Sequence, residues 1–191
     1  MNGSFSVALV AQMAIAQFCS FASLLLLASA VHKLRGWARA QHAVHELTGL
    51  PKGLAGMAAI GIAAAELASG LGLWVPAVRL DAALLASLVW AGYLVFLLRA
   101  VMSGRRDLDC GCSFSSAHRP LGAFHVTRAA VLTGLSLLVA LSAAVAPGAV
   151  PYDLSAAAVL TELLAGIALL VLYAALDQVM AVQPLRAGIQ A

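Results

Sequence analysis

Two cysteines separated by a single glycine are the residues of this chain with the clearest chemical potential. They lie in the run Asp109-Cys110-Gly111-Cys112-Ser113. Gly111 supplies the backbone freedom that a small disulfide ring needs in order to close. Because such a ring departs from relaxed disulfide geometry, its bond is easier to reduce than a structural disulfide. The pair is therefore a candidate redox dithiol.

Charged neighbours act on these thiols in both directions. Cations favour the thiolate and carboxylates oppose it, so the sequence does not fix the net effect. The cations are Arg105, Arg106, His118 and Arg119, and the acids are Asp107 and Asp109.

Two other interpretations of the cysteine pair stay open. The pair could be two ordinary loop cysteines. It could also be a metal site in which Cys110, Cys112 and His118, with His125, act as soft ligands. Structural zinc sites usually have wider cysteine spacing and four firm ligands, which favours the redox interpretation.

Cys19 is the third cysteine, and it falls near the middle of the first apolar block. A buried cysteine usually behaves as a small apolar residue. The alternative is a third redox thiol that passes a disulfide along within the bilayer. That role requires the cysteine loop to fold down into the helices.

Glu66 is an acid near the centre of an apolar block. Such residues usually face the interior of a bundle with a partner, either as a proton relay or as a structural hydrogen-bonding group. Gly70 and Gly72 follow it and allow close helix approach. Glu162 allows the same two interpretations. The candidate partners of Glu66 are Gln12, Gln17, Tyr93, Arg128 and Glu162.

The amino-acid composition indicates that the chain is a membrane protein. Of the 191 residues, 63% are apolar and 10% are charged, and the mean hydropathy is +0.98. A soluble domain has roughly a quarter charged residues, so both a soluble enzyme and a disordered chain are excluded. The net charge of +3 comes from basic residues in the loops, which set membrane topology and do not indicate nucleic-acid binding.

Five apolar blocks are long enough to cross a bilayer as helices, which needs roughly 20 residues each. The sequence predicts an all-α, polytopic helix bundle in which residues 1–191 form one membrane domain. The fifth block contains Glu162 and Asp177, so four spans with an interfacial tail are the alternative. Asp81 and Asp177 are expected at the membrane interface. The predicted spans are residues 5–31, 53–75, 80–102, 121–146 and 154–182.

The connections between the blocks differ in character. Residues 76–79 and 147–153 read as tight turns because proline and glycine break the helix there. Residues 32–52 mix apolar and basic side chains and are predicted to form an amphipathic helix in the headgroup region. Residues 103–120 form the polar loop with the cysteine pair.

The basic residues predict an orientation. Ten of the eleven Lys and Arg residues fall on one side of the predicted spans, with Arg79 alone on the other. The positive-inside rule therefore places the N-terminus outside the cytoplasm and the cysteine loop inside it.

Four short runs of residues resemble a known family. They are residues 31–34 (Val-His-Lys-Leu), 66–67 (Glu-Leu), 70–73 (Gly-Leu-Gly-Leu) and 109–112 (Asp-Cys-Gly-Cys). The first three resemble the DoxX-like membrane proteins. The cysteine loop resembles that of the methylamine-utilisation branch, the MauE family.

The resemblance implies a function beyond the residues themselves. It implies a bacterial inner-membrane protein needed for maturation of the small (beta) subunit of methylamine dehydrogenase, which has a tryptophan tryptophylquinone cofactor and many disulfides and matures in the periplasm. It implies a thioredoxin-like partner of the MauD type that faces Cys110 and Cys112. It fixes no role for Glu66 or Cys19, and it implies no cofactor of the protein's own.

The resemblance and the charge pattern disagree about the side on which the chemistry takes place. Charge places Cys110 and Cys112 in the cytoplasm, whereas the substrate is periplasmic. Either the protein carries reducing equivalents across the membrane, or the orientation is inverted. The alternative functions are a non-enzymatic scaffold or export factor, and metal handling through Cys110, Cys112 and His118. DoxX-like relatives are linked to quinone chemistry, but no residue identifies a quinone pocket.

Overall fold

The computed structural model describes residues 2–104, 123–145 and 155–187, and the side chains of residues 9–104, 123–145 and 155–179. Within these ranges the chain is helical and contains no strand. The helices are α1 (Asn2–Arg35), α2 (Trp37–Thr48), α3 (Lys52–Gly72), α4 (Arg79–Met102), α5 (Ala123–Val145) and α6 (Ala156–Ala187), with a 3-10 helix, η1 (Pro76–Val78), between α3 and α4.

Five of these helices are long and apolar enough to cross a membrane, and they correspond to the five predicted blocks. The all-α, multi-pass membrane fold is therefore confirmed. The first helix is longer than predicted, since α1 continues to Arg35 and includes His32 and Lys33. The predicted amphipathic segment is correspondingly shorter, because α2 covers only Trp37–Thr48.

α1 and α3 pack closely at the end of the bundle near η1. The Ser23 hydroxyl donates to the Gly70 carbonyl oxygen at 2.6 Å, and the Trp74 indole donates to the Ser23 hydroxyl at 2.6 Å. A Cβ atom at Gly70 would lie 2.9 Å from Leu27 Cγ. The close approach predicted for Gly70 is confirmed, because only a missing side chain leaves this space.

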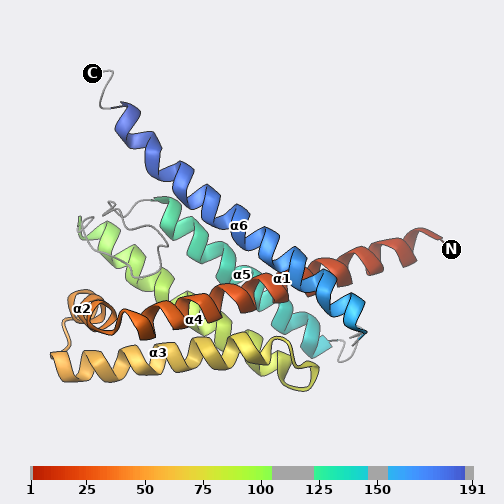
Figure 1. Cartoon of the computed structure of the whole chain (residues 1–191), viewed down its shortest axis with the longest axis horizontal. Coiled ribbons are helices and arrows are strands. Elements are labelled where there is room, and N and C mark those ends of the chain that lie inside the picture. Colours follow the sequence, from red (N-terminus) through yellow and green to blue (C-terminus); the bar gives the residue numbers. More distant parts are fainter. Residues whose placement is uncertain (1, 105–122, 146–154, 188–191) are drawn as a thin grey trace.

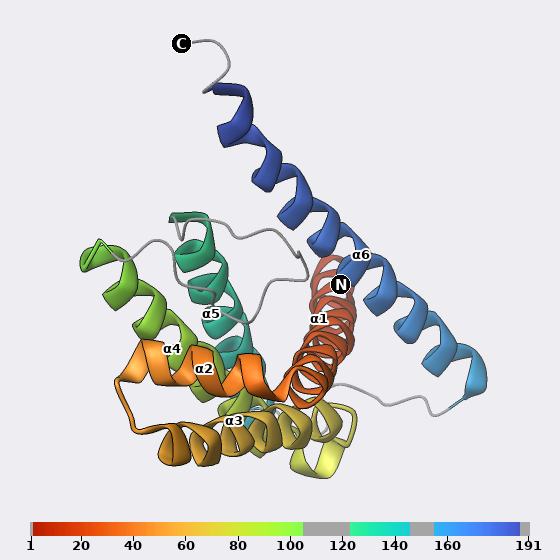
Figure 2. The ribbon, with the colours of Figure 1, turned by 60° about the vertical axis from the view of Figure 1, so that its left-hand side comes forward.

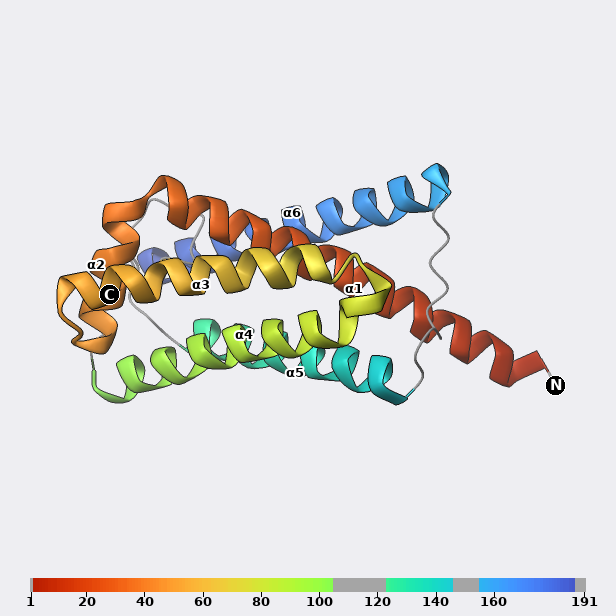
Figure 3. The ribbon, with the colours of Figure 1, turned by 90° about the horizontal axis from the view of Figure 1, so that it is seen from below.

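A short turn joins α3 to α4. Val75 is extended, and Pro76 begins η1, as expected from the fixed φ of proline and its effect on the preceding residue. A Cβ atom at Gly72 would lie 2.8 Å from the Ala82 Cβ, so the turn brings the two helices into direct contact. Figure 3 shows α3 and α4 running antiparallel from this turn.

α4 and α5 form the other closely packed pair (Figure 3). Near the end of α4, Leu97 and Ala100 pack with Ala129 of α5 in a small apolar cluster. This cluster lies at the end of the bundle where residues 103–120 connect the two helices. The helices that flank the predicted cysteine loop are therefore held side by side.

α6 is attached to the bundle chiefly through α1. The Ser20 hydroxyl donates to the Glu162 carbonyl oxygen at 2.9 Å, and a Cβ atom at Gly166 would lie 2.7 Å from Ser20 Oγ. Figures 1 and 2 show α6 crossing α1 and then diverging from the other helices toward its C-terminal end.

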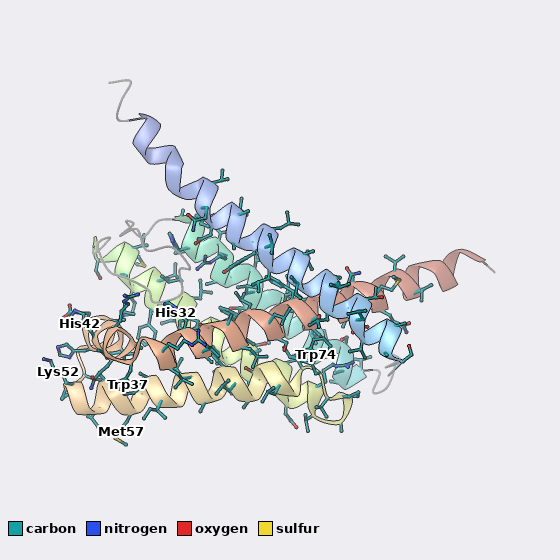
Figure 4. All side chains as sticks on the ribbon, in the orientation of Figure 1. His32, Trp37, His42, Lys52, Met57 and Trp74 are labelled. Atoms are coloured by element: carbon teal, nitrogen blue, oxygen red, sulfur yellow. The ribbon has the colours of Figure 1, made fainter. Side chains whose placement is uncertain are left out.

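α2 folds back across the end of the bundle. Gly49 ends this helix with a positive φ of 72°, which glycine adopts without strain. The Gln41 side chain donates to the Lys52 carbonyl oxygen at 2.8 Å and joins α2 to the start of α3. Figure 4 shows His32, Trp37 and Lys52 at this end, with Trp74 at the other.

Candidate functional site

Glu66 is the centre of a buried polar cluster between α1, α3 and α4. Its side chain is fully buried. The carboxylate accepts hydrogen bonds from the Tyr93 hydroxyl at 2.6 Å and from the Ser29 hydroxyl at 2.9 Å. The Lys33 ammonium lies 2.8 Å from Oε1 and 3.1 Å from Oε2. We call Ser29, Lys33, Glu66 and Tyr93 the Glu66 cluster.

Lys33 reaches this carboxylate because α1 continues beyond the predicted end of the first span. Ser29 and Lys33 are four residues apart and therefore lie on the same helix face. The Lys33 ammonium donates to Ser29 Oγ at 2.6 Å and lies 5.2 Å from the centre of the Tyr93 ring. Its charge is compensated by the carboxylate and by the face of the aromatic ring.

Sequence reasoning found part of this cluster. Tyr93 was among the predicted partners of Glu66, and the structure confirms the contact. Lys33 and Ser29 were missed, because Lys33 was assigned to the headgroup-facing amphipathic segment. A signal was available: Lys33 and Glu66 are opposite charges in or beside consecutive apolar blocks, and such charges tend to pair.

The Glu66 cluster holds an ion pair and crosslinks three helices. Hydrogen-bond donors from Ser29, Lys33 and Tyr93 surround the carboxylate, so its oxygens are partnered within the bundle. An isolated charge at this depth would be costly, whereas a paired and hydrogen-bonded charge is tolerated. A proton relay through Glu66 stays a prediction.

A second ion pair joins α5 to α6. The Arg128 guanidinium lies 3.0 Å from Asp177 Oδ1 and 5.2 Å from the centre of the Tyr173 ring. Arg128, predicted as a partner for Glu66, therefore pairs with a different acid. Asp177 was expected at the interface, and its side chain is only 3% exposed.

Glu162 lies apart from the Glu66 cluster. It lines a cavity of about 360 Å³ between α1 and α6, together with Gln17 and Thr161. In the described residues, no three His, Cys, Asp or Glu side chains come close enough to hold a metal ion. The predicted redox pair Cys110 and Cys112, and the alternative ligand His118, lie outside the described residues.

Comparison with known proteins identifies the family. The family model described as methylamine utilisation protein MauE matches residues 10–143. The chain belongs to the MauE family. It is 32% identical to a methylamine utilization protein MauE from Paracoccus denitrificans, over 80% of each chain. It is 33% identical to a protein of that name from Methylophilus methylotrophus, over 85% of this chain and 84% of the relative. No solved structure matches.

The matched region of this MauE-family protein contains both the Glu66 cluster and the Asp109-Cys110-Gly111-Cys112 run. It ends within α5, so α6 lies beyond the match. The family places the protein in methylamine utilisation.

Cys19 of this MauE-family protein belongs to a part of the core that lies well away from Met102, the last residue of α4. Cys19 is a free, buried cysteine in the apolar core that includes Ala86 and Trp90 of α4. Ala86 precedes Met102 by 16 residues, which is about 24 Å along a helix. The structure thus shows Cys19 as a small core residue, and its role as a third thiol stays a prediction.

Proposed function

We propose that this protein supports maturation of the small subunit of methylamine dehydrogenase by thiol–disulfide exchange at Cys110 and Cys112. The observation that carries the proposal is the spacing of the two thiols, with one glycine between them in the most polar stretch of a membrane protein. The family assignment supports it, since the relatives are named for methylamine utilisation. The protein would act at the bacterial inner membrane.

The packing of α4 against α5 supports this role. Leu97, Ala100 and Ala129 hold α4 and α5 together near Gly104 and Ala123, the described residues that flank the cysteine pair in the sequence. Both ends of the dithiol segment are therefore attached at the same end of the bundle. A thioredoxin-like partner of the MauD type could then approach from the aqueous phase.

The proposed exchange is balanced in sulfur bonds and electrons. One thiolate of the pair, for example that of Cys110, attacks a disulfide of the partner, and the displaced partner sulfur leaves as a thiolate. The Cys112 thiolate then attacks Cys110 Sγ, which closes the Cys110–Cys112 disulfide and releases the reduced partner. Two electrons pass to the partner, and the reverse sequence returns them.

Replacing both cysteines tests this role. We expect the C110S/C112S double variant to lower active methylamine dehydrogenase in cells by more than tenfold, because neither sulfur can form the mixed disulfide. The measurements are dehydrogenase activity and the disulfide content of its small subunit. Cys19→Ser is the matched control, and we expect it to leave both unchanged.

The single variant Cys112→Ser tests the order of the exchange. With the resolving sulfur absent, a mixed disulfide between Cys110 and the partner should accumulate and be visible on a non-reducing gel. If the double variant still yields fully active enzyme, the redox role is wrong and a scaffold or export role takes its place.

A further inference from the structure

A long groove opens beside the Glu66 cluster, between α2, α3 and α4. Its volume is about 480 Å³, which is within the range of small-molecule sites. Along α4 its lining runs from Phe96 to Leu85, about 16 Å of helix. α2 covers one end, and exposed Leu88 lies toward the other. The groove is therefore long and narrow and is accessible from the bilayer.

The lining changes from polar to apolar along this groove. Its polar side chains come mainly from the end of α1 and from α2, and they include His32, Arg39 and Thr48. The contributions of α3 and α4 are apolar except for the Tyr93 hydroxyl, which donates to Glu66. A ligand that matches this lining has a polar head beside α2 and a hydrocarbon chain between α3 and α4.

The charge at the polar end of the groove is positive. Lys33 and Arg39 line the groove, and no Asp or Glu is among its described lining residues. Lys33 is neutralised by Glu66. The exposed Arg39 side chain has no hydrogen bond or ion pair within the part of the chain that the structure describes. A guanidinium in this position matches the geometry of a phosphate.

We propose that this groove is a binding site for an anionic phospholipid. The phosphate binds Arg39, with His32 beside it, and one acyl chain lies between α3 and α4 from Phe96 toward Leu85. Figure 4 shows His32 at the end of the bundle where α2 lies. Such a lipid would fix α2 to the bundle at the membrane surface. The site is independent of the cysteine pair.

Native mass spectrometry of the full chain in neutral detergent tests the site. The probes are phosphatidylglycerol and phosphatidylcholine with identical acyl chains. We expect one phosphatidylglycerol to bind tightly, and Arg39→Gln to weaken it roughly fivefold, as for loss of one surface cation. Arg99→Gln is the matched control, because Arg99 lies at the same end of the bundle but does not line the groove.

A second pair of variants tests the acyl chain. A Cβ atom at Gly92 would have no neighbour within 4 Å, and Gly92 lines the groove. Gly92→Leu should fill the groove and abolish the bound lipid while the protein stays folded. Gly61 lines the groove from α3, and Gly61→Leu is the second variant if Gly92→Leu fails to fold. Gly134→Leu on α5 is the control.

Three results would overturn the proposal. Equal binding of phosphatidylcholine and phosphatidylglycerol would show that the anionic headgroup is not recognised. Lipid retained by folded Gly92→Leu would show that the acyl chain does not lie in the groove. Displacement of the lipid by soluble glycerol phosphate at equal concentration would show that the phosphate alone is recognised and the acyl chain contributes nothing.

Discussion

The buried ion pair between Lys33 and Glu66 adds little net stability, yet the loss of either partner alone is expected to be destabilising. The carboxylate is fully buried and the lysine side chain is 11% exposed. Forming the pair requires both groups to lose water, so it adds little net stability. Removing only one partner is different, because the other charge is then left without compensation.

Lys33→Met is therefore expected to destabilise the protein by about 3 kcal/mol. The measurement is thermal unfolding of the detergent-solubilised protein, in which size-exclusion chromatography quantifies the protein that remains folded after heating. Lys52→Met is the matched control, because Lys52 is exposed and its side chain has no ion pair in the described residues. A Lys33→Met protein as stable as the control would contradict the role of the pair.

The double variant K33M/E66M separates the charge from the packing. With both charges gone, an apolar pair of similar size should recover most of the lost stability. A double variant as unstable as Lys33→Met alone would show that Glu66 acts mainly through Ser29 and Tyr93, whose hydrogen bonds the carboxylate also accepts.

The sequence predicted only part of this cluster. Glu66 was identified because an acid in an apolar block requires a partner, and Tyr93 was among the predicted partners. Lys33 was not, because the predicted first span ended at residue 31 and α1 ends at Arg35. One further helical turn moved the lysine from the headgroup region into the bundle.

At the scale of the elements, the helices pack closely at glycines, where no side chain keeps the neighbouring helix away. The absent Cβ of Gly72 would lie 2.8 Å from the Ala82 Cβ. Since Ala82 is a short side chain fixed to α4, it cannot rotate away. A side chain at Gly72 could be accommodated only if the backbone of the turn through Pro76–Val78 moved α3 and α4 apart.

Gly72→Ala should destabilise the protein by about 1–3 kcal/mol, because α3 and α4 must separate to admit the methyl group. Thermal unfolding in detergent measures the effect. Gly61→Ala is the control, since a Cβ there meets no atom within 4 Å. Equal stability of the two variants would mean that the turn adapts without cost.

The attachment of α6 gives a second prediction at this scale. Asp177 pairs with Arg128 of α5 at 3.0 Å, whereas α6 contacts α1 through neutral groups, the Ser20 hydroxyl and the Phe21 ring beside Tyr173. Asp177→Asn should raise amide hydrogen exchange in α6 at least tenfold more than in α3, because α6 loses its ionic contact with α5. Asp81→Asn, at an exposed position on α4, is the control. Uniform exchange in both variants would contradict this role.

At the scale of the whole molecule, hydropathy predicted the number of spans and their order. All five blocks became helices long enough to cross a bilayer, because backbone amides in lipid must pair within the helix. Hydropathy does not report which helices pack together. The tight α4–α5 pair depends on small side chains such as Ala129. The contact of α6 with α1, before α6 diverges (Figure 1), depends on the missing side chain of Gly166.

The cysteine pair was also reached from sequence alone, through its spacing. Its chemistry depends on which side of the membrane it faces. The length of α4 allows the orientation to be tested. Val75 lies beside the turn before α4, and Ser103 directly follows α4. The 24 residues of α4 span about 36 Å, more than the hydrocarbon core of about 30 Å. The two positions must therefore face opposite sides.

Single cysteines at these positions report the orientation. In a C19S/C110S/C112S background, Val75→Cys should react with a membrane-impermeant maleimide in intact cells, and Ser103→Cys should react only after lysis. This follows from the ten basic residues on the side of Ser103. The reverse pattern would place Cys110 and Cys112 in the periplasm, where direct exchange with a periplasmic partner needs no relay. The expected pattern requires electrons to cross the membrane, and a fully active Cys19→Ser variant would assign that transfer to a group other than Cys19.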